Sequence, residues 1–374
     1  MNEEKIIYFH TEYSNLQRFL DCANSMKVLN PNVSLTQSRL ILETLINSIV
    51  EGNGNLNSRI SELENFGVDY DIIDAMHQVR LLGNIGAHDQ MAFWKDADKT
   101  LKNLFKVMLW YGSSNQNQDL LADVQFCLAQ CYCEGIGVEP DTDKQVFWLK
   151  KSAENGSPFA QRDLGICYCT GQYVVADFKK AVNYLNQAVS QNLSDAEFYL
   201  GYFYLGDHGE FKRDTKLAHE LLIRAESKGN LLAEYVLAEC FNRFMAEWSS
   251  IPKDPEKVFQ RYSHIIETGL DNTIYQNLVT QVLVKLGDCY QYGLGTAKNL
   301  SKCFECYLKA SKRGNVSAYY KVAECYEKGV GVKIDAQKAE ENYSIAALMG
   351  HQGAHAKVNS LTYLKHKNRF KGGF

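Results

Sequence analysis

The sequence predicts an all-α protein in which an N-terminal helical bundle is followed by a right-handed α-solenoid. Three observations favour this fold class. A pattern of about 36 residues recurs through most of the chain, few segments alternate apolar and polar residues as strands do, and only five prolines occur in 374 residues. We expect the bundle to span residues 1–115, the solenoid residues 116–366, and a basic tail residues 367–374.

Composition is that of an ordinary soluble globular protein, with 45% hydrophobic and 22% charged residues. The net charge of -4 gives no general attraction to nucleic acid. No run of 18 apolar residues occurs, so no membrane span is expected. The first residues, MNEEKIIYFHTEY, are acidic and polar and do not resemble a secretion signal. Eleven cysteines without such a signal imply reduced thiols, and we expect a cytoplasmic location.

The N-terminal part of the chain, residues 1–112, does not repeat. Pro31 and Ser34 mark a helix start, and the sequence GNGN at 52–55 indicates a turn. An antiparallel bundle is the natural interpretation. We expect its helices near residues 11–28, 34–51, 56–66, 69–88 and 91–112.

The remainder of the chain carries tyrosines at a fixed spacing. Each follows a leucine and a small residue, and precedes a glycine-rich turn and a second helix. A gap of 50 residues from Cys240 to Tyr290 indicates an insertion of about 14 residues, which we expect near 246–257. The anchor tyrosines, 36 residues apart within each group, are Tyr132, Tyr168 and Tyr204, then Tyr290 and Tyr326.

This pattern, L-G/A-x-x-Y-x-x-G-x-G-V followed by K-A and A-x-x-G, closely resembles the Sel-like repeat (SLR), a relative of the tetratricopeptide repeat. The resemblance covers residues 120–356 in six units. The small residue lets paired helices approach, the tyrosine fills the wedge between units, and the glycine adopts the positive φ of a helix C-terminus. The resemblance implies a curved surface that binds a protein partner on its concave face.

Two other interpretations of the repeats are disfavoured. The sequences GIG, GLG and GVG recur at one repeat position with no preceding strand, so they indicate turns rather than a nucleotide-binding loop. The pair Cys303 and Cys306 has no second pair nearby, as a zinc site would require. We expect neither a cofactor nor a metal. A single core position of the repeat is expected to hold Cys131, Cys167, Cys240, Cys289 and Cys325.

The stretch RLLGNIGAHD at 80–89 combines glycines with polar residues late in the fourth predicted helix. On a helical wheel, Gly83 and Gly86 fall on the apolar face, where they would let a neighbouring helix come close. The polar residues form a stripe that the wheel places on the opposite face. Its members are His77, Arg80, Asn84 and His88.

Residues 15–112 resemble a HEPN-like domain of unknown function, a type found in bacterial restriction and phage-defence proteins. That family has a helix with R-x-x-L-E, a short helix with I-x-x-L, and a helix with R-x-x-G-N-x-x-A-H. The positions that match are Arg39, Glu43, Ile60, Leu63, Arg80, Gly83, Asn84, Ala87 and His88.

The resemblance leaves two functions open. The first is an interaction scaffold or sensor of a bacterial defence or regulatory system, in which the HEPN-like domain forms a homodimer and the solenoid binds a protein partner. The alternative is a metal-independent ribonuclease with Arg80, Asn84 and His88 as catalytic residues. There Arg80 would hold the phosphate of RNA, His88 would move a proton, and Asn84 would orient them. In active members the arginine lies closer to the histidine, and that position holds Gly83 here.

Overall fold

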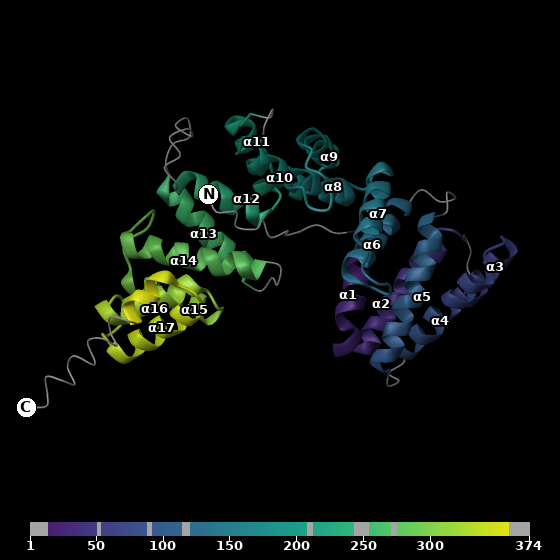
Figure 1. Cartoon of the computed structure of the whole chain (residues 1–374), viewed down its shortest axis with the longest axis horizontal. Coiled ribbons are helices and arrows are strands. Elements are labelled where there is room, and N and C mark those ends of the chain that lie inside the picture. Colours follow the sequence, from purple (N-terminus) through teal and green to yellow (C-terminus); the bar gives the residue numbers. More distant parts are fainter. Residues whose placement is uncertain are drawn as a thin grey trace, which may run out of the picture. The chain divides into compact units, whose positions relative to one another are not determined.

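The computed structural model describes residues 14–50, 54–87, 92–113, 120–207, 212–242, 254–270 and 275–358. Every regular element in these ranges is helical, which confirms the predicted fold class. The N-terminal bundle contains five helices (Figure 1): α1 (Asn15–Leu29), α2 (Pro31–Asn47), α3 (Leu56–Asn65), α4 (Tyr70–Ala87) and α5 (Trp94–Ser113).

Short polar residues fix where the bundle helices begin. The side chain of Ser14 accepts a hydrogen bond from the backbone N–H of Gln17 at the start of α1. Asn30 caps α2 in the same way. Pro31 occupies the first turn of α2, where a backbone N–H has no acceptor within the helix, so the missing N–H of proline costs no hydrogen bond. The helix therefore starts three residues before the expected position, because the cap is Asn30 and not a residue nearer to Ser34.

Between the bundle and the helical residues 352–358, the described part of the chain forms six helix pairs, as the six predicted repeat units require. They are α6 (Leu121–Glu134) with α7 (Thr142–Glu154), α8 (Pro158–Thr170) with α9 (Phe178–Ser190), α10 (Ser194–Phe203) with α11 (Thr215–Ser227), α12 (Leu231–Asn242) with α13 (Pro255–Gly269), α14 (Gln276–Tyr292) with α15 (Leu300–Lys312), and α16 (Val316–Lys328) with α17 (Ala336–Leu348).

The repeat residues have the structural roles expected of them. The first helix of four units ends at a glycine in the left-handed conformation: Gly135, Gly171, Gly293 and Gly329. Anchor tyrosines pack edge-on against an aromatic ring of the preceding helix pair. Ring centroids are 5.4 Å apart for Phe259 and Tyr290 and 5.3 Å apart for Phe304 and Tyr326. These contacts place the tyrosine in the wedge between units.

The predicted cysteine position is also a core position. All five of its cysteines are buried: Cys131, Cys167, Cys240, Cys289 and Cys325. Burial raises the pKa of the Cys167 thiol to about 12 and that of Cys289 to about 11, so both remain protonated near neutral pH. Their environment suits a packing role.

The extra residues of the fourth unit are distributed over several places. The expected insertion near 246–257 falls largely on residues 243–253, outside the described part of the chain, and residues 255–257 form the first turn of α13. Helices α13 and α14 have 15 and 17 residues, whereas α15, α16 and α17 have 13 each. The unit is therefore irregular on both sides of α13.

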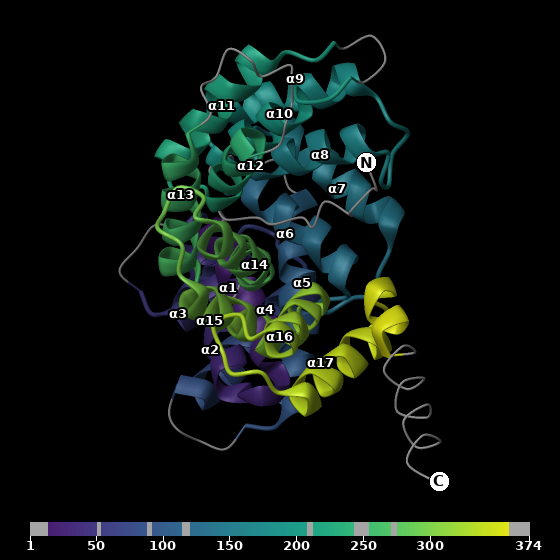
Figure 2. The same ribbon diagram turned by 90° about the vertical axis from the view of Figure 1, so that its left-hand side faces the viewer.

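The chain forms two compact units that divide between Arg213 and Asp214. The N-terminal unit contains α1 to α10, and the C-terminal unit contains α11 to α17. In the N-terminal unit a single hydrophobic core runs from Leu16 in the bundle to Ala181 in α9. Helix α6 packs against α5 and α1, so the first repeat continues directly from the bundle (Figure 2).

Polar residues at this α1–α6 contact make the N-terminal unit sensitive to pH. Gln130 on α6 donates to both Asp21 and Glu134. Burial and the nearby Glu134 carboxylate raise the pKa of Asp21 to about 6. The folded state therefore favours the protonated carboxyl, and the associated stability is lost as pH rises through about 6.

Asp21→Asn is expected to stabilise the protein at pH 8 and to have little effect at pH 3, below the ordinary aspartate pKa of 3.8. The gain at pH 8 should be about 1 kcal/mol, since Asp21 is only partly buried and solvent screens its charge. Urea unfolding at both pH values measures this difference. Asp71→Asn, at an exposed position of α4, is the control. An equal effect of Asp21→Asn at pH 3 and pH 8 would contradict the assignment.

Candidate functional site

The two glycines of the RLLGNIGAHD stretch bring α4 close to α2. A Cβ atom on Gly83 would lie 2.5 Å from the Cβ of Arg39, and one on Gly86 would lie 2.5 Å from the carbonyl oxygen of Asn32. Neither distance is possible for a real side chain. The expected role of these glycines in close helix packing is therefore confirmed.

Asn84 takes part in the same helix contact. Its Oδ1 accepts a hydrogen bond from the Nη1 of Arg39, whose Nε donates to Glu43 at 2.9 Å. The aliphatic part of Arg39 covers Gly83. Three residues of the predicted motif, Arg39, Glu43 and Asn84, thus form one connected group across α2 and α4. A helical wheel of α4 alone contains no information about the arginine on α2.

The polar stripe does not lie on the face opposite the core, as the wheel suggested. His77, Arg80 and Asn84 are half-buried at the edge of the buried face. Ile73, one turn before His77 on the same side of α4, is 1% exposed. The wheel misplaced the stripe because α2 and α3 cover α4 more widely than its apolar residues indicate.

Two polar atoms of the stripe have no hydrogen-bond partner among the described residues: His77 Nδ1 and Arg80 Nε, both buried. Burial and the neighbouring Arg80 lower the pKa of His77, so this imidazole is neutral near pH 7. His88 falls in residues 88–91, outside the described ranges. The structure therefore shows a hydrogen bond between Asn84 and Arg39, and the pairing of Arg80 with His88 stays a prediction.

Exposed apolar side chains gather at the end of the bundle where α4 finishes. Asn32, at the start of α2, meets Gly86 there. The end of α1 adjoins this point because α2 begins two residues after α1 ends, and the start of α5 follows the end of α4 in the chain. The exposed side chains at this end are Val28, Leu29, Phe93 and Trp94, which are 53–81% exposed. We call them the apolar end of the bundle.

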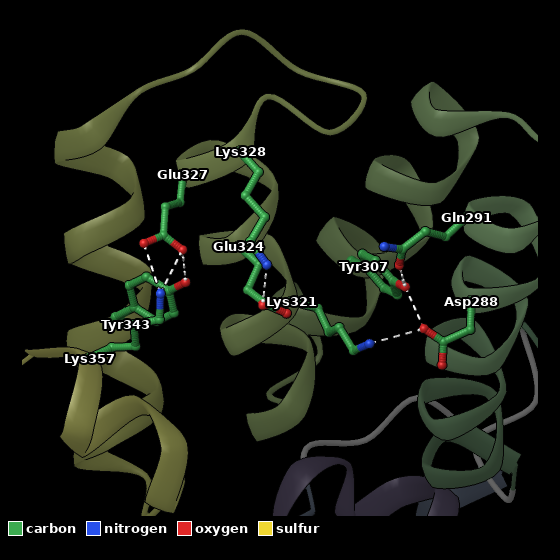
Figure 3. Close-up of polar contacts among 9 residues, drawn as sticks. All are labelled: Asp288, Gln291, Tyr307, Lys321, Glu324, Glu327, Lys328, Tyr343 and Lys357. Atoms are coloured by element: carbon green, nitrogen blue, oxygen red, sulfur yellow. Dashed lines mark hydrogen bonds and ion pairs between the residues drawn. The ribbon is translucent and has the colours of Figure 1, made fainter.

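In the C-terminal unit, each of three tyrosines bonds to a carboxylate that also pairs with a lysine further along the chain. Tyr307 donates to Asp288, and the Nζ of Lys321 lies 3.2 Å from the same carboxylate (Figure 3). Tyr343 donates to Glu327 at 2.7 Å, and Lys357 pairs with Glu327 at 2.9 Å (Figure 3). The third triad is Tyr262, Glu239 and Lys285.

The tyrosine of each triad comes from the second helix of a unit and the carboxylate from its first helix. Lys285 and Lys321 come from the first helix of the next unit, and Lys357 comes from the helical residues 352–358 that follow α17. The sequence interpretation missed them, although Tyr307 and Tyr343 are 36 residues apart and have Leu149, Leu185 and Leu222 as their counterparts in the first three units. A polar link therefore replaces an apolar contact in the last three units.

Asp288→Ala is expected to weaken the link between the fifth and sixth units by about 1–2 kcal/mol, because Tyr307 and Lys321 lose their shared partner. Hydrogen exchange of α14 to α16 measures this loss locally. Glu324→Ala is a matched control, 36 residues later in the same repeat position. Its partner is Lys328 on the same helix at 2.7 Å, and such pairs contribute only a few tenths of a kcal/mol. Equal effects of the two substitutions would contradict the role of the triad.

A cavity of about 650 Å³ lies in the N-terminal unit, where the first repeat unit meets the second. Helix α7 forms one wall, and the turn at 171–177 with the start of α9 forms the other. Aromatic and charged side chains line it together, among them Phe147, Lys150, Tyr168, Tyr173 and Lys180. Sequence reasoning did not single out this place, because its turn was one of several repeat turns.

Neither membrane nor metal features occur in the described ranges. No helix there combines the length and the apolar character needed to cross a bilayer. The same ranges contain no cluster of three or more histidine, cysteine, aspartate or glutamate side chains placed to hold a metal ion.

Comparisons with known proteins bear on both parts of the chain. Residues 22–113 match the family described as Domain of unknown function (DUF4145). A search of curated proteins found no match. Five segments match the Sel1 repeat: 122–157, 158–193, 194–230, 281–315 and 316–351. The unmatched interval contains α12 and α13, the irregular fourth pair.

Solved structures share the fold. A Sel1 repeat protein from Oxalobacter formigenes is 22% identical, with a TM-score of 0.55 over 74% of this chain and 97% of that one. The protein c5321, described as a protective antigen present in uropathogenic Escherichia coli strains displaying an SLR fold, is 21% identical, with a TM-score of 0.59 over 94% of this chain and 68% of that one. The repeat fold supports a protein-interaction scaffold. The chain thus contains Sel1 repeats and, before them, an N-terminal DUF4145 domain.

Proposed function

We propose that this protein is an interaction scaffold in which the repeats bind a protein partner and the N-terminal bundle pairs with a second copy of the chain. The observation that carries the proposal is the apolar end of the bundle. Phe93 and Trp94 are 63% and 53% exposed there, beside Val28 and Leu29. Soluble monomers rarely expose several large apolar side chains together, and such patches are typical of interfaces.

The polar motif fits an interface better than an independent active site. Asn84 is held by Arg39, and Gly83 lies beneath the same arginine. These contacts use the motif to set the geometry of α2 against α4. Arg80 and His88 would then contribute polar contacts beside the apolar end when two bundles meet.

The bundle's resemblance to HEPN-like domains supports a setting in bacterial defence or regulation. Such domains pair through their helices, and the repeats would hold the protein that is sensed or regulated. In this proposal the partner lies on the concave face, which the first helices of the units form.

Solution mass tests the pairing. We expect twice the 42.5 kDa of one chain at micromolar concentration. Trp94→Glu should shift the protein to the monomer, because it places a charge in the proposed contact. Leu348→Glu is the matched control, since Leu348 is 88% exposed in the C-terminal unit. A wild-type monomer at 100 µM, or equal masses for the two variants, would rule out pairing through this end.

A second candidate function, a metal-independent ribonuclease, is favoured by one observation. The buried Nε of Arg80 and Nδ1 of His77 have no partner among the described residues. Unpartnered buried donors are costly, and an anion such as a phosphate would satisfy them. Cleavage of RNA in the presence of EDTA, abolished by Arg80→Ala, would establish this function in place of the scaffold.

A further inference from the structure

The cavity between the first two repeat units lies where the sequence departs from the repeat pattern. In three other units the third residue of the turn is a glycine with positive φ: Gly137, Gly295 and Gly331. A Cβ on Gly331 would lie 1.9 Å from the carbonyl oxygen of Leu300, the first residue of α15, and one on Gly295 would lie 1.9 Å from that of Pro255, the first residue of α13. Only glycine lets these turns lie directly on the preceding helix.

The second unit has Tyr173 at this position, with a φ of 66°. A tyrosine in the left-handed region costs about 1–2 kcal/mol, and its Cβ prevents the close contact that the glycines make. The corresponding residue of the preceding helix is Thr142, the first residue of α7. The cavity lies between this turn and α7. Strain that stability does not require is typical of functional sites.

Two more departures expose apolar side chains at the same cavity. Phe147 is 51% exposed on α7, and Val175 is 89% exposed on the turn. The counterparts of Phe147 in the second helices of the other units are all polar: Asn183, Glu220, Gln260, Glu305 and Glu341. The counterparts of Val175 in three other turns are Glu139, Ala297 and Lys333. The repeat fold alone requires none of these apolar residues here.

The charges of the cavity separate into two groups. Asp177 caps α9 and pairs with Lys180 at 3.3 Å, as Asp335 does with Lys338 at 3.5 Å in the sixth unit, so this pair belongs to the repeat. Asp143 and Lys150 have no ion pair in the part of the chain that the structure describes. They lie at the two ends of the cavity face of α7, with Phe147 between them.

We propose that this cavity binds an extended protein segment that inserts an aromatic side chain between Phe147 and Tyr173, with a basic and an acidic residue on either side of it. The basic residue would pair with Asp143 and the acidic residue with Lys150. The carboxylates of Asp143 and Asp177 disfavour the phosphates of RNA in the same place. This inference rests on the proposed scaffold function and gives its solenoid a second binding site, on the second helices α7 and α9 and apart from the face that the first helices form.

The spacing within the segment follows from α7. Asp143 and Lys150 are seven residues apart, or about 10 Å along a helix axis. An extended segment covers that length in about three residues. The expected pattern is therefore a basic and an acidic residue three positions apart, with the aromatic residue at one of the two positions between them.

Selection from a phage-displayed library of random eight-residue peptides on the full chain tests this site. Selected peptides are then synthesised with a fluorescent label, and their binding is followed by anisotropy. We expect peptides with the stated pattern. Phe147→Asn and Tyr173→Gly, which restore residues found in other units, should each weaken binding at least tenfold. Tyr292→Asn, at an aromatic residue 63% exposed in the C-terminal unit, should leave binding unchanged.

A charge exchange provides a check that does not depend on stability. Lys150→Glu should weaken binding of a selected peptide at least tenfold, and replacing the acidic residue of that peptide with lysine should restore it. Binding that persists in Phe147→Asn and Tyr173→Gly would overturn the site but leave the scaffold function intact. Failure to select any peptide would overturn the site, whereas a monomeric wild type in the mass measurement would contradict the pairing in the scaffold function. A labelled oligouridine whose binding is lost in Phe147→Asn would assign the cavity to RNA and overturn the proposal.

Discussion

Replacing Gly331 with alanine is expected to destabilise the C-terminal unit by about 3 kcal/mol or more. Two costs add at this position. Gly331 has a φ of 69°, which penalises any residue with a Cβ, and that Cβ would lie 1.9 Å from the carbonyl oxygen of Leu300. The clash involves backbone on both sides, so the sixth unit must move away from the fifth. Urea unfolding and hydrogen exchange of α15 to α17 measure the effect.

Gly314→Ala separates the two costs. Gly314 also has a positive φ, of 84°, but a Cβ there would meet nothing within 4 Å. Both glycines lie in the C-terminal unit, and because a Cβ at position 314 meets no neighbour, only the conformational penalty of about 1–2 kcal/mol applies there. If Gly314→Ala proves as costly as Gly331→Ala, the contact between the turn and α15 is not what requires glycine.

Gly86→Val is expected to cost about 3 kcal/mol in the N-terminal unit. Its Cβ would lie 2.5 Å from the carbonyl oxygen of Asn32 and 3.0 Å from the Cβ of Leu35. The backbone of α2 is closely packed and cannot move aside locally, so α2 and α4 must separate along their buried contact. Thermal and urea unfolding of the full chain measure the loss.

The next residue on the same helix provides the control. Ala87 is exposed, and Ala87→Val should change stability by less than about 0.5 kcal/mol. The two variants place valine on the same turn of α4, but only valine at position 86 faces α2. Comparable losses would mean that the end of α4 is sensitive to valine itself, and the close packing against α2 would lose its support.

The repeat architecture was readable from the sequence because its signals are local and recur. A glycine at a helix end, a tyrosine two or three residues before it and a small residue facing the paired helix each have their own physical reason. Because these residues recur at a fixed spacing, the helix boundaries predicted in one repeat support those predicted in the next. The sequence gives no such signal for the division between Arg213 and Asp214, because this point lies within the third repeat, between its helices α10 and α11.

The bundle site was predicted only in part, because a wheel considers one helix at a time. It identified Gly83 and Gly86 as packing residues. It placed Asn84 on an open face, whereas Arg39 reaches it from α2. The triads of the C-terminal unit were missed for a related reason. Asp288, Tyr307 and Lys321 come from three helices, and no pattern within one repeat joins them.

We propose that RLLGNIGAHD serves packing and pairing in an interaction protein. The most direct measurement incubates wild type and His88→Ala with total bacterial RNA in EDTA while recording the solution mass of each. We expect a dimeric wild type and no RNA cleavage by either protein, because Asn84 is already bonded to Arg39. Cleavage by the wild type that disappears in His88→Ala would contradict the claim and identify the motif as a nuclease site.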